Sequence, residues 1–160
     1  MQDLFERLEH VSWVSAIGST GWMYSTASVI HYFTLFILVG TIVLVDLRVL
    51  GVAGRRQNLT TLAGQLFPWM WVSFGLAVLS GFIEFATGAG DFFPDKVFRV
   101  KMLMIVLALI FTVIVQRKVP RWGQLPAIPA GAKLLAFISL LLWIGTILAG
   151  VEIAAISGLG

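Results

Sequence analysis

The sequence predicts an all-α membrane protein, a four-helix bundle whose helices cross the bilayer. Of its 160 residues, 59% are hydrophobic and only 12% are charged. Soluble proteins carry about 25% charged residues, so this composition is typical of a membrane protein. Four apolar stretches approach or exceed the roughly 20 residues that a helix needs to cross the ~30 Å hydrocarbon layer. We predict spans at about 22–47, 66–88, 97–117 and 132–156 within one transmembrane domain, residues 1–160.

A short amphipathic helix is predicted before the first span. Leu4, Phe5, Leu8 and Val11 recur at helical spacing, and the charged residues of this segment occupy the opposite face. A helix of this kind lies in the interface between lipid and water. Because the segment is net acidic, we expect packing on the bundle, and not attraction to anionic lipid, to hold it in place.

The predicted loops follow from the breaks in the apolar pattern. Pro68 is placed in the first turn of the second span, where the missing N–H of a proline costs nothing. Loop one then covers 51–65, loop two covers 87–96 and loop three covers 116–131. Because loop three contains Pro120 and two further prolines, we expect that it is not helical throughout.

The basic residues predict the orientation in the membrane. Loops one and three and the adjoining helix ends carry a single acid, Asp46, and seven basic residues: Arg48, Arg55, Arg56, Arg117, Lys118, Arg121 and Lys133. By the positive-inside rule these loops are cytoplasmic, so both termini and loop two face outward. We expect Asp46 to pair with Arg48, Arg55 or a residue of loop three. Since the basic residues lie beside the spans, no nucleic-acid partner is expected.

His31 is the only ionisable residue deep in the first span. Its helical face also carries polar residues at three- and four-residue steps, namely Tyr24, Ser28, Thr34 and Thr41. This polar stripe should face the bundle. Because an ionisable side chain is costly to bury in a membrane, His31 is a candidate functional residue. The structural alternative is a neutral histidine that bonds to a serine or a backbone carbonyl of a neighbouring helix.

A second polar group consists of charged residues that lie toward the outer side on three spans: Glu84, Arg99, Lys101 and Glu152. Opposite charges at similar depth should pair, because an isolated charge there would be neutralised by gain or loss of a proton, or its side chain would extend to the interface. One interpretation is a polar chamber that reaches toward His31 and binds an ion, a quinone head group or a charged partner. The other is a salt-bridge clasp between helices.

Haem b and quinone are the cofactors that we consider. A transmembrane haem needs two axial ligands, most often histidines on facing helices. The chain has two histidines, and His10 belongs to the interfacial segment. His31 with Met104 (or Met102) is therefore the candidate ligand pair, although methionine near a membrane histidine more often fills core space. The absence of cysteine excludes thiolate metal sites and disulfides.

Two short motifs, Asp46-Leu47-Arg48 and Phe98-Arg99-Val100-Lys101, are distinctive local sequences of the chain. With the segments 30–33, 40–51, 68–69, 142–143 and 149–150, they make the chain similar to a family of small four-span bacterial membrane proteins of unknown function. That family looks distantly like the copper-resistance D membrane proteins and the four-helix cytochromes of the b561 kind. The resemblance implies a multi-pass protein of the bacterial inner (plasma) membrane. Relatives carry a histidine near the end of span three, where this chain has Gln116, and this weakens the haem interpretation.

The sequence predicts a non-enzymatic integral membrane protein, a subunit or anchor of a larger membrane assembly. It contains no nucleophile–base pair, phosphate loop or Glu-x-x-His motif. Its expected partners are the lipid bilayer and other membrane subunits or a second copy of the chain. Two alternatives stay open: a haem- or quinone-linked electron-transfer subunit that uses the His31 pocket, and an ion or metal conduit through Glu84, Glu152 and His31.

Overall fold

The fold, obtained as a computed structural model, is described for residues 10–54 and 56–156, with the backbone alone over 152–156. In these ranges the regular structure is entirely helical. Two helices are short, α2 (Ser12–Ser19) and α5 (Ala89–Phe92), and four are long: α3 (Gly21–Leu50), α4 (Leu59–Ala86), α6 (Lys96–Trp122) and α7 (Ala130–Ile156). The predicted all-α class with four long apolar helices is confirmed.

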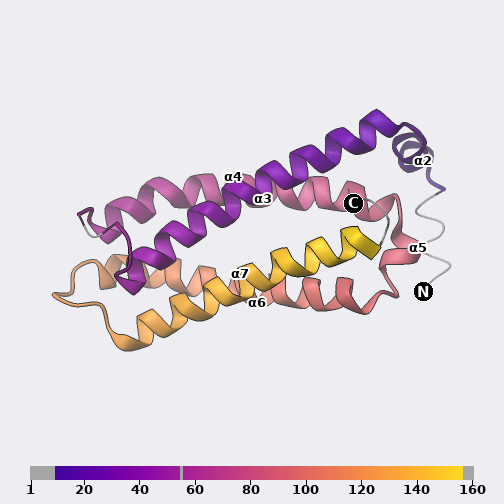
Figure 1. Cartoon of the computed structure of the whole chain (residues 1–160). Coiled ribbons are helices and arrows are strands. Elements are labelled where there is room, and N and C mark those ends of the chain that lie inside the picture. Colours follow the sequence, from indigo (N-terminus) through magenta and orange to yellow (C-terminus); the bar gives the residue numbers. More distant parts are fainter. Residues whose placement is uncertain (1–9, 55, 157–160) are drawn as a thin grey trace.

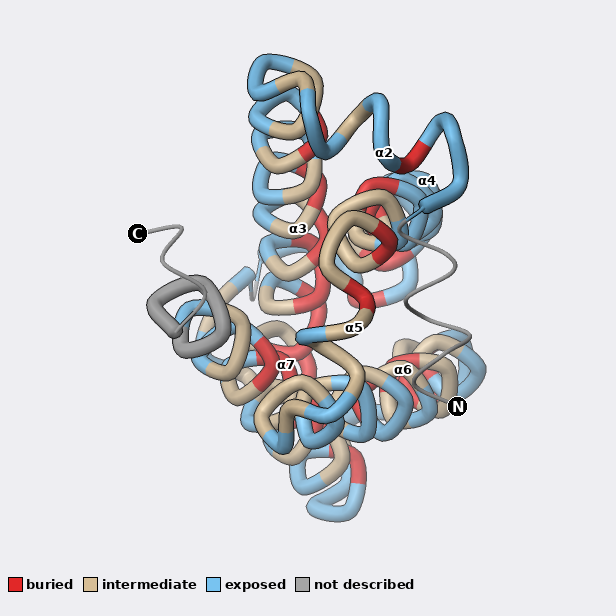
Figure 2. The backbone as a smooth tube through the Cα atoms, turned by 90° about the vertical axis from the view of Figure 1, so that its right-hand side faces the viewer, coloured by how far each residue is buried: buried red, intermediate tan, exposed pale blue. Residues whose placement is uncertain are grey.

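The long helices run side by side and alternate in direction, so that α2 and α5 lie at the same end of the molecule (Figure 1). Helix α3 packs against α4, α6 packs against α7, and the two hairpins meet chiefly along α3 and α7. Helix α3 is the most buried of the four and α6 is the least buried. Viewed along the helices, buried positions face inward and exposed positions face outward (Figure 2). The interior therefore consists of the seams between helices.

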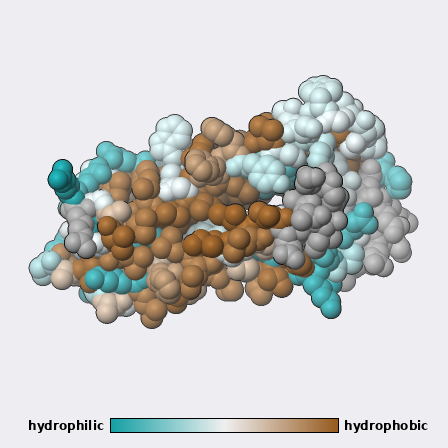
Figure 3. Space-filling view, in the orientation of Figure 1, coloured by the Kyte–Doolittle hydropathy of each residue, from teal (hydrophilic) through white to brown (hydrophobic). Residues whose placement is uncertain are grey.

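The outer surface is apolar over the middle of the helices. Figure 3 shows a broad hydrophobic belt between hydrophilic ends on the face in view. Large apolar side chains are exposed on the surface, among them Phe36, Leu79 and Leu148. Each long helix is long and apolar enough to cross a membrane. Because lipid is the solvent in which such a belt is stable, the chain is a multi-pass membrane protein.

Helix α4 begins at Leu59, seven residues before the predicted start, and Pro68 lies inside it and not in its first turn. The prediction was wrong because the start is set by a cap. The Asn58 side chain accepts hydrogen bonds from the backbone N–H groups of Thr60 (2.8 Å) and Thr61 (3.4 Å). An asparagine at this position satisfies donors that the helix leaves unpaired, so the polar turns before Pro68 are helical.

Helix α6 continues through Pro120 to Trp122, so the predicted loop three starts too early. The extension is explained by packing, because Val119 and Trp122 are both buried against the neighbouring helices. Loop two contains the short helix α5, whose Phe92 stacks with Phe98 at a centroid distance of 6.1 Å. Helix α3 ends at Leu50 because Gly51 adopts a φ of 79°, a left-handed conformation that favours glycine.

The predicted interfacial helix can be compared only in part, because its residues Leu4, Phe5 and Leu8 lie outside the described residues. Within the described part, α2 precedes the first span, and Val14 is its buried residue. A break at Thr20 separates α2 from α3, and α2 packs against α3 beyond this break. The helix thus contacts the membrane-spanning part, as the sequence predicts for this segment.

Two apolar clusters fill the interior. The end cluster lies where α3 ends and α4 begins, and includes Val45, Val49, Leu59, Val115 and Ala136. The central cluster contains Leu38, Ile42, Met70, Ala108 and Trp143. Trp143 is 1% exposed, and its indole N–H donates a hydrogen bond of 3.0 Å to the Thr112 hydroxyl of α6. This hydrogen bond joins α6 to α7 within the apolar central cluster.

We predict that Thr112→Val destabilises the protein by about 1–3 kcal/mol, because the buried Trp143 N–H then has no acceptor. Thr146→Val is the matched control, since the Thr146 hydroxyl donates to Leu142 of its own helix, and the loss should be smaller. Unfolding in detergent micelles measures both. Equal losses for the two variants would show that the Trp143 bond contributes nothing specific.

Candidate functional site

His31 docks on α4 through one ring nitrogen. Its Nδ1 lies 3.0 Å from the Ala77 carbonyl oxygen and 3.1 Å from the Ser80 hydroxyl. Since a carbonyl can only accept, Nδ1 carries a hydrogen and donates it. The Ser80 hydroxyl itself donates to the Leu76 carbonyl at 2.7 Å. These contacts are those of the structural alternative for His31, a neutral histidine that bonds to a serine or a backbone carbonyl of a neighbouring helix.

Gly81 is the residue that lets the imidazole approach α4. A Cβ atom added at Gly81 would lie 2.8 Å from Cε1 and 3.2 Å from Nδ1 of His31. Contacts that short force the ring to move. The small side chain at this position therefore determines how closely α3 and α4 approach at the polar site.

The other ring nitrogen of His31 faces an acid. Nε2 lies 4.0 Å from Oε2 of Glu84, and both side chains are largely buried, at 12% and 21% exposed. Because Nδ1 already carries a hydrogen, Nε2 of the neutral ring presents a lone pair to the carboxylate. Two acceptors facing one another repel unless a proton is bound to one of them. At 4.0 Å the two groups face one another across the seam between α3 and α4 without a direct hydrogen bond.

Of the predicted cluster residues whose side chains are described, Lys101 lies near this pair and Arg99 does not. Lys101 is partly buried on α6, and it interacts electrostatically with both Glu84 and His31. Its Nζ is 3.4 Å from the position that a Cβ would take at Gly150 of α7. The ammonium group thus lies against α7, the neighbour of α6 in the same hairpin.

Arg99 does not join the cluster. It is exposed, and its guanidinium donates a 2.7 Å hydrogen bond to the Pro94 carbonyl of loop two. Among the described residues, the ion pair within 4.0 Å joins Glu84 to His31 and not to a basic residue of α6. The side chain of Glu152 lies outside the described residues. The structure therefore brings together His31 and Glu84, with Lys101 nearby.

Met104 is turned toward α7, where its methyl group contacts the space over Gly145. His31 instead docks on α4, and its Nε2 faces Glu84. This geometry does not favour the predicted pairing of His31 and Met104 as haem ligands. Gln116 accepts a 3.1 Å hydrogen bond from the Trp71 indole and so links α6 to α4.

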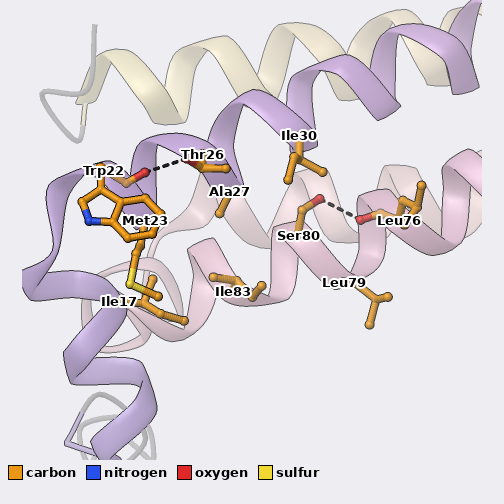
Figure 4. Close-up of a pocket in the computed structure, with 10 residues that line it drawn as sticks. All are labelled: Ile17, Trp22, Met23, Thr26, Ala27, Ile30, Leu76, Leu79, Ser80 and Ile83. Atoms are coloured by element: carbon orange, nitrogen blue, oxygen red, sulfur yellow. Dashed lines mark hydrogen bonds between the residues drawn. The ribbon is translucent and has the colours of Figure 1, made fainter.

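An apolar groove of about 330 Å³ lies along the α3–α4 seam at the end near α2. Figure 4 shows side chains from α2, α3 and α4 that point into it, among them Ile17, Met23, Leu79, Ser80 and Ile83. Ser80 is shared by the groove and the His31 site, because its hydroxyl contacts Nδ1 of His31. The groove is thus lined mainly by apolar side chains, with Ser80 in one wall.

Asp46 forms a second polar site that the sequence-based interpretation missed. It is 1% exposed, and its electrostatic partner is Ser139 of α7, which is 0% exposed. Of the predicted partners, Arg48 donates instead to the Gln57 carbonyl at 3.0 Å, and Arg55 lies outside the described residues. No ion pair joins Asp46 to a described residue of loop three. The signal available in the sequence was a carboxylate within an apolar stretch, four residues before the helix end, together with a lone serine in the fourth span.

Comparison with known proteins gives one match. A model of a family of unknown function, DUF6644, matches residues 4–155. The chain belongs to this family. No curated protein matches it, and no solved structure does. The predicted likeness to copper-resistance D and b561 proteins finds no support in these comparisons, whereas the likeness to a family without known activity is confirmed.

For this DUF6644 protein, we predict that Gly81→Ala displaces the His31 ring and breaks its bond to Ala77. Gly75→Ala on the same helix is the control, since no atom lies within 4 Å of a Cβ there. The imidazole ¹⁵N resonances of His31, recorded in micelles, should move for Gly81→Ala and stay in place for Gly75→Ala. Unchanged resonances in both variants would contradict the close approach of the ring to α4.

Proposed function

We propose that the protein is a non-enzymatic subunit of a larger membrane assembly. The observation that carries this proposal is an apolar face of α6, the least buried span. Leu103, Val106, Leu107 and Ile110 follow one another at helical spacing and are all exposed. A face of this kind contacts either lipid tails or a helix of another subunit, and the second possibility would give α6 the burial that the other three spans already have.

The proposed setting is the bacterial inner membrane, with both termini outside. What supports this orientation is the excess of Arg and Lys around loops one and three. In this orientation the His31–Glu84 pair lies in the outer half of the membrane and Asp46 lies near the cytoplasmic side. A partner subunit would then contact α6 between the level of the His31–Glu84 pair and the level of Asp46.

The assembly should survive extraction. We predict that mild solubilisation of native membranes yields the protein with a second membrane protein or with another copy of itself. Val106→Trp on the exposed face of α6 should reduce this association about tenfold, the equivalent of about 1.4 kcal/mol. Leu148→Trp, which replaces an exposed residue of α7, should leave it unchanged. Native mass spectrometry measures both; a solitary monomer in the wild type would contradict the proposal.

A second candidate function, quinone binding, is favoured by the groove between α2, α3 and α4. A quinone has a flat ring and an isoprenoid tail, and the groove is lined mainly by apolar side chains, with Thr26 and Ser80 as its hydroxyl-bearing residues. The Ser80 hydroxyl donates to the Leu76 carbonyl. The apolar lining is suited to the faces of the ring and to the tail, which leaves the groove toward lipid. Electrons would come from a partner subunit.

The quinone proposal predicts that quinone co-purifies with the protein. Leu79→Trp should fill the groove and lower the bound quinone about tenfold. Leu148→Trp is a matched control because Leu79 and Leu148 are each 64% exposed, and it should keep the wild-type amount. Solvent extraction followed by mass spectrometry measures the quinone. Equal amounts in both variants would remove the groove as the binding site.

A further inference from the structure

Asp46 and Ser139 face one another across the seam between α3 and α7. Both residues are fully buried, at 1% and 0% exposed. Within the described part of the chain, neither Oδ2 of Asp46 nor the hydroxyl oxygen of Ser139 has a hydrogen-bond partner. A buried polar atom without a partner is rare in folded proteins, and two that lie on adjacent side chains call for a common explanation.

Among the described residues (Arg55 lies outside them), no opposite charge is found beside Asp46. The end cluster packed around this level is apolar on all four long helices. Helix α4 has no charged residue before Glu84, and on α3 itself Arg48 is bonded to Gln57. The remaining described basic groups of this end are exposed and lie on loop one, α6 and α7: Arg56, Arg117, Lys118, Arg121 and Lys133.

We propose that Asp46 and Ser139 form a proton-binding site inside the membrane-spanning helices. A carboxylate without a counter-charge is costly to bury, and a bound proton removes the charge. The protonated acid has an O–H that can donate to the Ser139 hydroxyl, so the two side chains can be hydrogen-bonded when the charge is removed. A metal ion fits less well, because Na⁺, Mg²⁺ or Ca²⁺ takes more oxygen ligands than these two side chains supply.

The position of the site connects the proton to the contact between the two hairpins. The hairpins meet chiefly along α3 and α7, and Asp46 and Ser139 belong to these two helices. Loss of the proton places a charge in this contact, while its binding restores a neutral, hydrogen-bonded seam. The site is also separate from the His31–Glu84 pair. His31 and Asp46 are 15 residues apart on α3, or about 22 Å at helical rise.

Infrared spectroscopy of the full-length protein in liposomes at neutral pH tests the proposal. The wild type should show a protonated-carboxyl C=O band that shifts when the aspartates carry ¹³C in their side-chain carboxyls. Asp46→Asn is a neutral replacement of similar shape and should fold without this band. Glu84→Gln, a control at the other polar site, should retain it. A band that persists in Asp46→Asn, or is absent from the wild type, would overturn the proposal.

A second variant keeps the test decisive if Asp46→Asn does not fold. Ser139→Ala preserves the acid and removes its hydroxyl partner. The C=O band of Asp46 should then move to the frequency of a carboxyl group without that hydrogen bond. Ser25→Ala, at an exposed serine of α3 that bonds to its own helix, should leave the band in place. An unchanged band in Ser139→Ala would mean that the two side chains do not share a proton, and would also overturn the proposal.

Discussion

Polar side chains within lipid-spanning helices must find their partners inside the protein, because hydrocarbon offers none. This constraint explains how the polar groups of the chain are arranged. The hydroxyls of Thr34, Thr41 and Thr112 donate to carbonyls of their own helices, so they cost little on the inner seams. Titratable groups cannot be satisfied in this way. They are gathered at seams where a second helix supplies a partner, and the close approach at Gly81 is what brings that partner to His31.

Two such seams occur along α3, one near each end. The His31–Glu84 pair joins α3 to α4, with Lys101 of α6 nearby, whereas Asp46 and Ser139 join α3 to α7. The central cluster around Trp143 lies between them and is apolar. This arrangement separates the two polar sites by a packed apolar layer. It also places both sites on the most buried helix, whose position depends on both of its neighbours.

The existence and number of the spans could be predicted because hydropathy and length suffice for that purpose. Their ends could not, since the start of α4 depends on the Asn58 cap and the end of α6 depends on the burial of Trp122. The sequence predicted a polar chamber that reaches from Glu84 toward His31, but not their direct approach, because that approach depends on the small residue Gly81. Arg99 was misplaced because a loop carbonyl bonds it, and Asp46 was paired with nearby arginines because its partner, Ser139, is distant in sequence.

The central claim is that the polar faces of the spans turn inward around the His31 site. The chain has no cysteine, so single cysteines placed at each position from 76 to 84 can be spin-labelled without background. Oxygen accessibility in liposomes should follow a helical period, with high values at 79 and 82 and low values at 77, 80 and 84. High accessibility to oxygen at 77, 80 and 84 would place this face against lipid and contradict the account.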